Sequence, residues 1–130
     1  MPLALPPLSF RRAAAVGASL GIGFVLLMPG EWVPQVTHAQ EFGLHAAVFF
    51  ALALAWTLAL PRVPVRVTLA LAAVAAGSEW LQAYVVPLRT GALDDLLANL
   101  IGLTAGALIG AAVTRRDRRD APGLADEAGR

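Results

Sequence analysis

Four long apolar blocks dominate the sequence, and they restrict its possible folds more than any other feature. The chain has 130 residues, of which 58% are hydrophobic and only 15% are charged. An average soluble domain is about a quarter charged. Each block is close to the length of about 20 residues that a membrane-spanning helix needs. The four blocks are Ala13–Met28, Gly43–Leu60, Val67–Val86 and Leu96–Val113.

None of the blocks has the polar face that a helix of a soluble bundle requires, which argues against a soluble helical protein. We therefore predict an all-α fold, a bundle of four transmembrane helices over residues 11–29, 43–60, 66–86 and 94–114. Together they form one transmembrane domain, residues 1–114. Residues 115–130 combine many charges with Pro and Gly and are predicted to be a disordered cytoplasmic tail or a frayed helix.

The arginines, which supply all ten basic residues, predict the orientation of the bundle. Loops rich in Arg and Lys stay in the cytoplasm, so both termini are predicted to be cytoplasmic and the protein to be a multi-pass protein of the cell membrane. Cleavage of the first block as a signal peptide is an alternative, which would leave three spans. Arginines flank the predicted inner ends at Arg11, Arg12, Arg62, Arg66, Arg115, Arg116, Arg118 and Arg119, whereas the two predicted outer loops contain only Arg89.

Polar residues interrupt the apolar blocks in one short region, "GSEWLQAYVVPLRTGALDDLLANLIG". A carboxylate near the bilayer centre costs about 2.5–3.5 kcal/mol, so such groups face the interior of a bundle and pair there. The predicted topology brings this region and His45 to the outer end of the bundle. The polar residues of the region are Glu79, Gln82, Arg89, Asp94, Asp95 and Asn99.

This region is similar to the signature of the VanZ-like family of membrane proteins. The family carries an acidic residue and a Gln three apart, a loop Arg, an Asp six residues later and an Asn four after that. The matching positions here are Glu79, Gln82, Arg89, Asp95 and Asn99.

An earlier family element, an acidic residue, Lys, two variable residues and His, resembles "EFGLH". Glu41 and His45 match it, and Phe42 replaces the lysine. The resemblance covers Glu41–Gly110 and implies a small polytopic protein of the cell envelope. Some members of the family are linked to resistance to glycopeptide antibiotics, teicoplanin in particular.

The expected function is recognition of a phosphate-bearing lipid or a lipid-linked cell-wall precursor at the outer leaflet. Arg89 suits bidentate recognition of an anion, although an internal salt bridge to Asp95 or Glu79 is the alternative. Gln82 and Asn99 are expected to donate hydrogen bonds to the ligand, and Glu79, Asp95 and His45 to orient these groups or to move a proton. No cofactor and no nucleic acid is expected, and a homo-oligomer remains an open alternative.

Two other functions fit the same residues. Glu79 and His45 are the candidate acid–base pair of a membrane-embedded hydrolase or transferase. In the second alternative the polar residues only hold the helices of the bundle together, and the protein binds no ligand. Asp94 is expected to be a solvated residue at the start of its helix, where the helix dipole favours an acid.

A metal site is a further alternative. His38, Glu41 and His45 follow each other at helical spacing, and two imidazoles with a carboxylate can bind zinc.

Small residues predict where the helices touch, because lipid provides no hydrophobic force between them. In the last block the positions 95, 99, 102, 106 and 110 form one helical stripe. Gly17 and Gly21 of the first block and Ala72 and Ala76 of the third are predicted to form matching contact faces.

Overall fold

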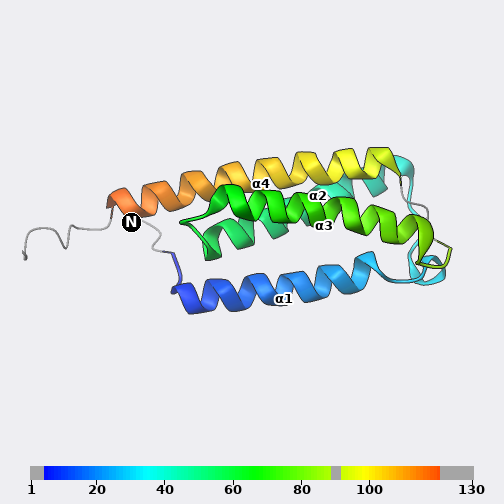
Figure 1. Ribbon diagram of the computed structural model, residues 1–130, viewed down its shortest axis with the longest axis horizontal. Helices are drawn as coiled ribbons and strands as arrows, with labels where there is room; N and C mark the ends of the chain where they lie inside the picture. Colours follow the sequence, from blue (N-terminus) through cyan, green and yellow to red (C-terminus); the bar gives the residue numbers. More distant parts are fainter. Residues whose placement is uncertain (1–4, 89–91, 121–130) are drawn as a thin grey trace, which may run out of the picture.

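The computed structural model describes residues 5–88 and 92–120, and within these it is entirely helical, with no strand. The helices lie side by side along one long axis (Figure 1). The all-α prediction is confirmed. The elements are α1 (Leu8–Leu26), the short 3-10 helix η1 (Gly30–Trp32), α2 (His38–Ala59), α3 (Pro64–Tyr84) and α4 (Leu93–Asp120).

Helix α2 begins earlier than predicted, at His38 rather than at residue 43, because Thr37 caps it. The Thr37 hydroxyl accepts a hydrogen bond from the backbone N–H of Gln40 at 3.3 Å, and the Gln40 side chain accepts one from the backbone N–H of Thr37 at 2.9 Å. This reciprocal pair is a capping box, which satisfies two backbone donors at a helix start. The earlier start brings Glu41 onto the same helix as His45.

Helices α2 and α4 form the closest contact of the bundle, and the glycines of α4 make it possible. A Cβ atom on Gly102 would overlap the backbone carbonyl of Ala46, and one on Gly106 would overlap the carbonyl of Phe50. A Cβ on Gly110 would lie only 2.8 Å from a side-chain atom of α2. The predicted contact stripe of the last block is therefore confirmed, and its partner is α2.

The prediction for the other small residues was wrong at three of the four positions. A Cβ atom on Gly17 or Gly21 would meet nothing within 4 Å, and Ala76 is exposed. Ala72 is half-buried and packs against the core, as predicted. The fully buried alanines of α1 and α3 are Ala15 and Ala75, each 0% exposed. Spacing between small residues marks a possible contact face, but which face turns inward depends on the neighbouring helices.

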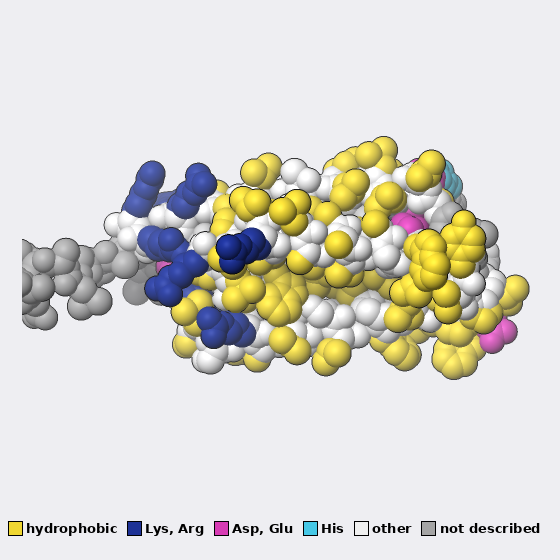
Figure 2. All heavy atoms as spheres, viewed as in Figure 1, with side chains coloured by type: hydrophobic (Ala, Val, Ile, Leu, Met, Phe, Trp, Pro, Cys, Tyr) yellow, Lys and Arg dark blue, Asp and Glu magenta, His cyan; other side chains and the backbone are white. Residues whose placement is uncertain are grey.

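The outer surface of the bundle is apolar along most of its length. Hydrophobic side chains cover the middle of the molecule, and arginines gather at one end (Figure 2). Within the described residues, α2 and α4 are long and apolar enough to cross a membrane, with mean hydropathies of 1.9 and 2.0. Helices α1 and α3 are less apolar, since α1 begins with Arg11 and Arg12 and α3 carries Glu79.

At the arginine end, two arginines tie α1 and α4 to the end of α2 and to the loop that follows it. An Arg118 guanidinium nitrogen donates to the carbonyl of Pro61, and one of Arg11 donates to the carbonyl of Leu58, both at 3.0 Å. Helix α4 continues past residue 114 to Asp120, so the first part of the predicted tail is helical. The remainder, residues 121–130, lies outside the described residues.

Candidate functional site

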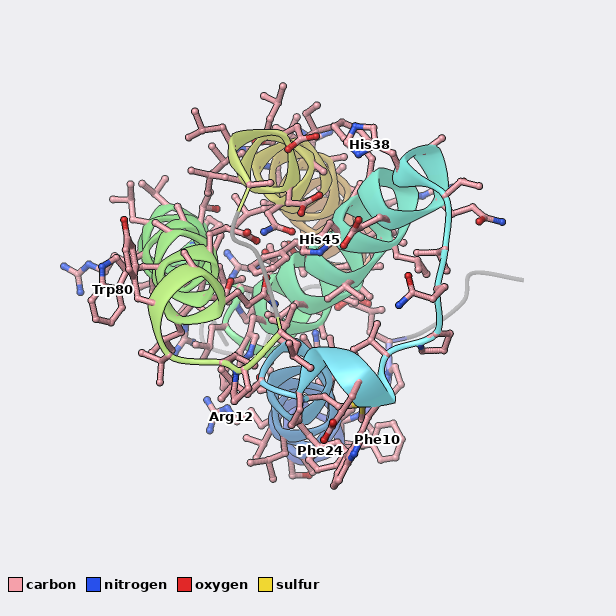
Figure 3. All side chains as sticks on the ribbon, turned by 90° about the vertical axis from the view of Figure 1, so that its right-hand side faces the viewer. Phe10, Arg12, Phe24, His38, His45 and Trp80 are labelled. Carbon is pink, nitrogen blue, oxygen red and sulfur yellow. The ribbon has the colours of Figure 1, made fainter. Side chains whose placement is uncertain are left out.

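Five of the polar residues singled out in the sequence meet at the end of the bundle opposite the arginines. Three helices supply them: His45 from α2, Glu79 and Gln82 from α3, and Asp95 and Asn99 from α4. Each is buried, and none is more than 7% exposed. Seen along the bundle from this end, His45 lies between α2 and α4 (Figure 3). We call these five residues the polar cluster.

A chain of hydrogen bonds through Asn99 links the three helices. The Asn99 amide nitrogen donates to Glu79 Oε1 at 2.9 Å, and its carbonyl oxygen lies 3.1 Å from His45 Nδ1. An ionised carboxylate only accepts hydrogen bonds, so the amide nitrogen of Asn99 must face Glu79. Its carbonyl oxygen must then accept from His45. His45 therefore carries its proton on Nδ1, which leaves a lone pair on Nε2.

Glu79 also holds the start of α4. Its second carboxylate oxygen, Oε2, accepts from the backbone N–H of Ala92 at 3.3 Å, just before the first residue of the helix. A carboxylate is favourable there because the first N–H groups of a helix lack partners within it. The distance from Glu79 Oε1 to His45 Nδ1 is 3.5 Å, so the imidazole also lies beside the carboxylate.

Gln82 lies in the cluster, but its hydrogen bond is to α1. Its amide nitrogen donates to the carbonyl of Leu26 at 2.8 Å. Leu26 is the last residue of α1, and the last carbonyl groups of a helix have no N–H partner within it. The Gln82 side chain thus ties α3 to α1.

Within the described residues, Asp95 is the one member of the cluster with a fully buried polar atom that has no hydrogen-bond partner. The residue is 4% exposed, and its Oδ1 is buried with no partner in the described part of the chain. One ligand atom each from Glu41, His45 and Asp95 lies within 4.8 Å of the other two. The structure thus brings together two carboxylates and an imidazole from α2 and α4.

The metal-ligand set expected from the sequence was partly wrong. Glu41 and His45 are in the group that the structure assembles, but His38 is not, and Asp95 takes its place. His38 Nε2 instead lies 2.9 Å from a carboxylate oxygen of Asp94, with the two side chains 72% and 42% exposed. Asp94 is therefore partly solvated, as expected, and has an imidazole partner. Helical spacing cannot reveal Asp95, because it comes from a different helix.

The two loops at this end contact each other beside the cluster. The backbone N–H of Gly30 donates to the carbonyl of Pro87 at 3.0 Å, and a Cβ on Gly30 would overlap the Leu88 backbone. Leu88 has a backbone φ angle of 55°, which residues other than glycine rarely adopt. A cavity of about 200 Å³ lies between the loops, lined by Gly30, Val33, Pro34, Gln35, Val36, Glu41 and Leu88.

Arg89, the predicted anion ligand, lies outside the described residues. Comparison of the chain with protein-family models, curated proteins and solved structures gives no match. The resemblance to the VanZ-like family therefore stays a prediction from the motif residues. Three of those residues, His45, Glu79 and Asn99, form one hydrogen-bonded chain.

Proposed function

We propose that this chain is a VanZ-like, multi-pass protein of the cell membrane with four spans and both termini in the cytoplasm. Helices α1 and α3 have 19 and 21 residues. At 1.5 Å per residue they are about 30 Å long, which matches the hydrocarbon core of a bilayer. Placing the arginine end in the cytoplasm and the polar cluster outside satisfies the positive-inside rule.

A cavity at the arginine end supports this orientation. It has a volume of about 540 Å³, and four arginines, Arg11, Arg12, Arg62 and Arg118, are part of its lining. The cytoplasmic leaflet carries anionic lipids, and basic pockets between helices on that side attract their headgroups.

The proposed function is recognition of a phosphate-bearing lipid, or of a lipid-linked cell-wall precursor, at the outer end of the bundle. The observation that carries it is the buried chain His45–Asn99–Glu79 at that end. Five buried polar residues are costly in a membrane protein and mark sites of function. A phosphate needs a positive partner, and the guanidinium of Arg89 provides it from the loop that follows Leu88.

The roles of the polar cluster differ from those expected from sequence. Both ends of the Asn99 amide are engaged with His45 and Glu79, and Gln82 is bonded to α1. Each amide nitrogen therefore uses one of its two N–H groups within the bundle, and both residues are at most 2% exposed. In this proposal the cluster positions the two outer loops, and Arg89 makes the contact with the phosphate.

An enzymatic function is the second candidate, and one distance favours it. His45 Nδ1 lies 3.5 Å from Glu79 Oε1, which suits a pair that moves a proton in a hydrolase or transferase. Turnover of a lipid pyrophosphate by the purified protein, abolished in Glu79→Gln, would establish this candidate. Tight binding without turnover supports recognition.

Lipid that purifies with the protein tests the recognition proposal. We expect the wild-type protein to retain a phosphate-bearing lipid and Arg89→Ala to retain about tenfold less, the loss of one charge-assisted contact worth about 1.4 kcal/mol. Lipid is identified and quantified by mass spectrometry of protein purified in mild detergent. Arg66→Ala is the matched control, because it removes an exposed arginine from the opposite end that does not line the basic cavity there.

Equal lipid retention by wild type and Arg89→Ala would contradict the proposal. If Arg89→Ala also unfolds at a lower temperature while lipid retention is unchanged, the arginine serves as an internal salt bridge. That result would favour the purely structural alternative.

A further inference from the structure

We propose that Glu41, His45 and Asp95 form a binding site for a divalent metal cation of the first transition series. Their ligand atoms lie within 4.8 Å of one another, close enough for small side-chain movements to bring all three onto one ion. Two come from one face of α2 and the third from the first turn of α4. The site is independent of the proposed lipid and differs from the set expected from helical spacing by containing Asp95 instead of His38.

His45 is prepared to bind a metal through Nε2. Its Nδ1–H donates to the Asn99 carbonyl oxygen at 3.1 Å, and Asn99 is fixed in turn by its bond to Glu79. A histidine that binds a metal almost always donates its other ring N–H to an oxygen, which fixes the tautomer and the ring orientation. Asn99 and Glu79 therefore act as the supporting residues of the site.

Asp95 provides a second, independent indication. One of its carboxylate oxygens is buried and has no hydrogen-bond partner in the described part of the chain, although the residue is only 4% exposed. A buried carboxylate without a partner is costly, and a bound cation would remove that cost. Within the described residues Glu41 forms no ion pair with an arginine, since the described arginines lie at the other end of the bundle (Figure 2).

The negative charge of the surroundings favours a cation. Three carboxylates, those of Glu41, Glu79 and Asp95, lie around a single imidazole, that of His45. Like charges at such short range repel strongly where little water is present. A divalent ion would neutralise two of the three charges.

The chemistry of the ligands indicates which metals fit. Imidazole suits zinc and other first-row metals, whereas carboxylates also accept manganese. Three protein ligands leave at least one coordination position open for water or an oxygen of a ligand. Glu41 is half-buried and lines the cavity between the two outer loops, which gives an ion a route to the site.

Direct metal binding tests the proposal. Full-length protein in detergent is stripped with a chelator and titrated with Zn²⁺ and with Mn²⁺ against a competing indicator. We expect wild type to bind one equivalent of metal. Asp95→Asn and Glu41→Gln should each weaken metal binding by about 10-fold or more, because loss of a residue that only supports a metal ligand already weakens binding by about 10-fold. Co²⁺ added to wild type should give a visible absorption band that both variants lack.

The control variants distinguish the ligand set seen in the structure, which contains Asp95, from the ligand set based on helical spacing, which contains His38. Asp94→Asn and His38→Gln change the neighbouring exposed pair, and we expect each to leave the affinity within about twofold, as for other surface changes. Glu41→Gln keeps the test valid if Asp95→Asn does not fold, because Glu41 lies outside the hydrogen-bonded chain. Loss of binding in His38→Gln but not in Glu41→Gln, or folded wild type that binds no equivalent of either metal, would overturn the proposal.

Discussion

Replacing Gly102 by alanine is expected to lower the free energy of unfolding by about 3 kcal/mol, the upper part of the usual range for overpacking. The added methyl group would overlap the backbone carbonyl of Ala46. A backbone atom cannot rotate away as a flexible side chain does, so α4 must move away from α2. That movement also weakens the contacts of Gly106 and Gly110 along the same stripe.

Gly17→Ala is the matched control for this prediction. It adds the same methyl group to a helix of the same bundle, at a position where nothing lies within 4 Å. We expect a change of no more than about 0.5 kcal/mol, as for other surface substitutions. Unfolding in mixed micelles with increasing SDS, followed by circular dichroism, compares the two variants with wild type. Equal midpoints for Gly102→Ala and Gly17→Ala would show that the glycine stripe does not control helix packing.

The second large effect is expected for Asn99→Leu. This change removes the donor to the Glu79 carboxylate and the acceptor for His45, both in a site where Asn99 is 0% exposed. A hydrogen bond to a charged group is worth about 1.5–3 kcal/mol, and we expect a loss near 3 kcal/mol. This exceeds the average of about 0.6 kcal/mol for interhelical hydrogen bonds in membranes, because the acceptor is a carboxylate.

A double variant separates the hydrogen bond from simple loss of packing. In Glu79→Met with Asn99→Leu, neither partner remains to be left unsatisfied, so the double change should cost about 2 kcal/mol less than the sum of the single changes. Thr104→Val is the control on the same helix, since the Thr104 hydroxyl bonds only to the carbonyl of Leu100 within α4. Strict additivity of the two single changes would mean that Asn99 and Glu79 do not interact in the folded protein.

Hydropathy and arginine placement were enough to predict the helices and the end at which the polar residues gather. Each apolar block lies largely within one helix, and the polar spacing in α3 and α4 placed Glu79 and Asn99 on inward faces. The sequence also contains the signal for the early start of α2. Thr37 followed three residues later by Gln40 is the pattern of a capping box, but it lies before the apolar run that marks this helix in the sequence.

The partners of these faces could not be predicted, because periodicity describes one helix at a time. It indicated that Gly102 faces a neighbour, but not that the neighbour is α2. The same limit explains the metal-ligand set. His38 shares a helix with Glu41 and so fits the spacing, whereas Asp95 joins the group only through the contact of α4 with α2.

The orientation of the bundle is the central claim, and cysteine labelling tests it most directly. The chain contains no cysteine, so a single introduced thiol has no background. Ser9→Cys places an exposed thiol at the arginine end, and Gln35→Cys places one beside the polar cluster. A membrane-impermeant maleimide is added to intact spheroplasts before and after permeabilisation. We expect Gln35→Cys to react at once and Ser9→Cys only after permeabilisation; the reverse order would place the polar cluster in the cytoplasm and contradict the account.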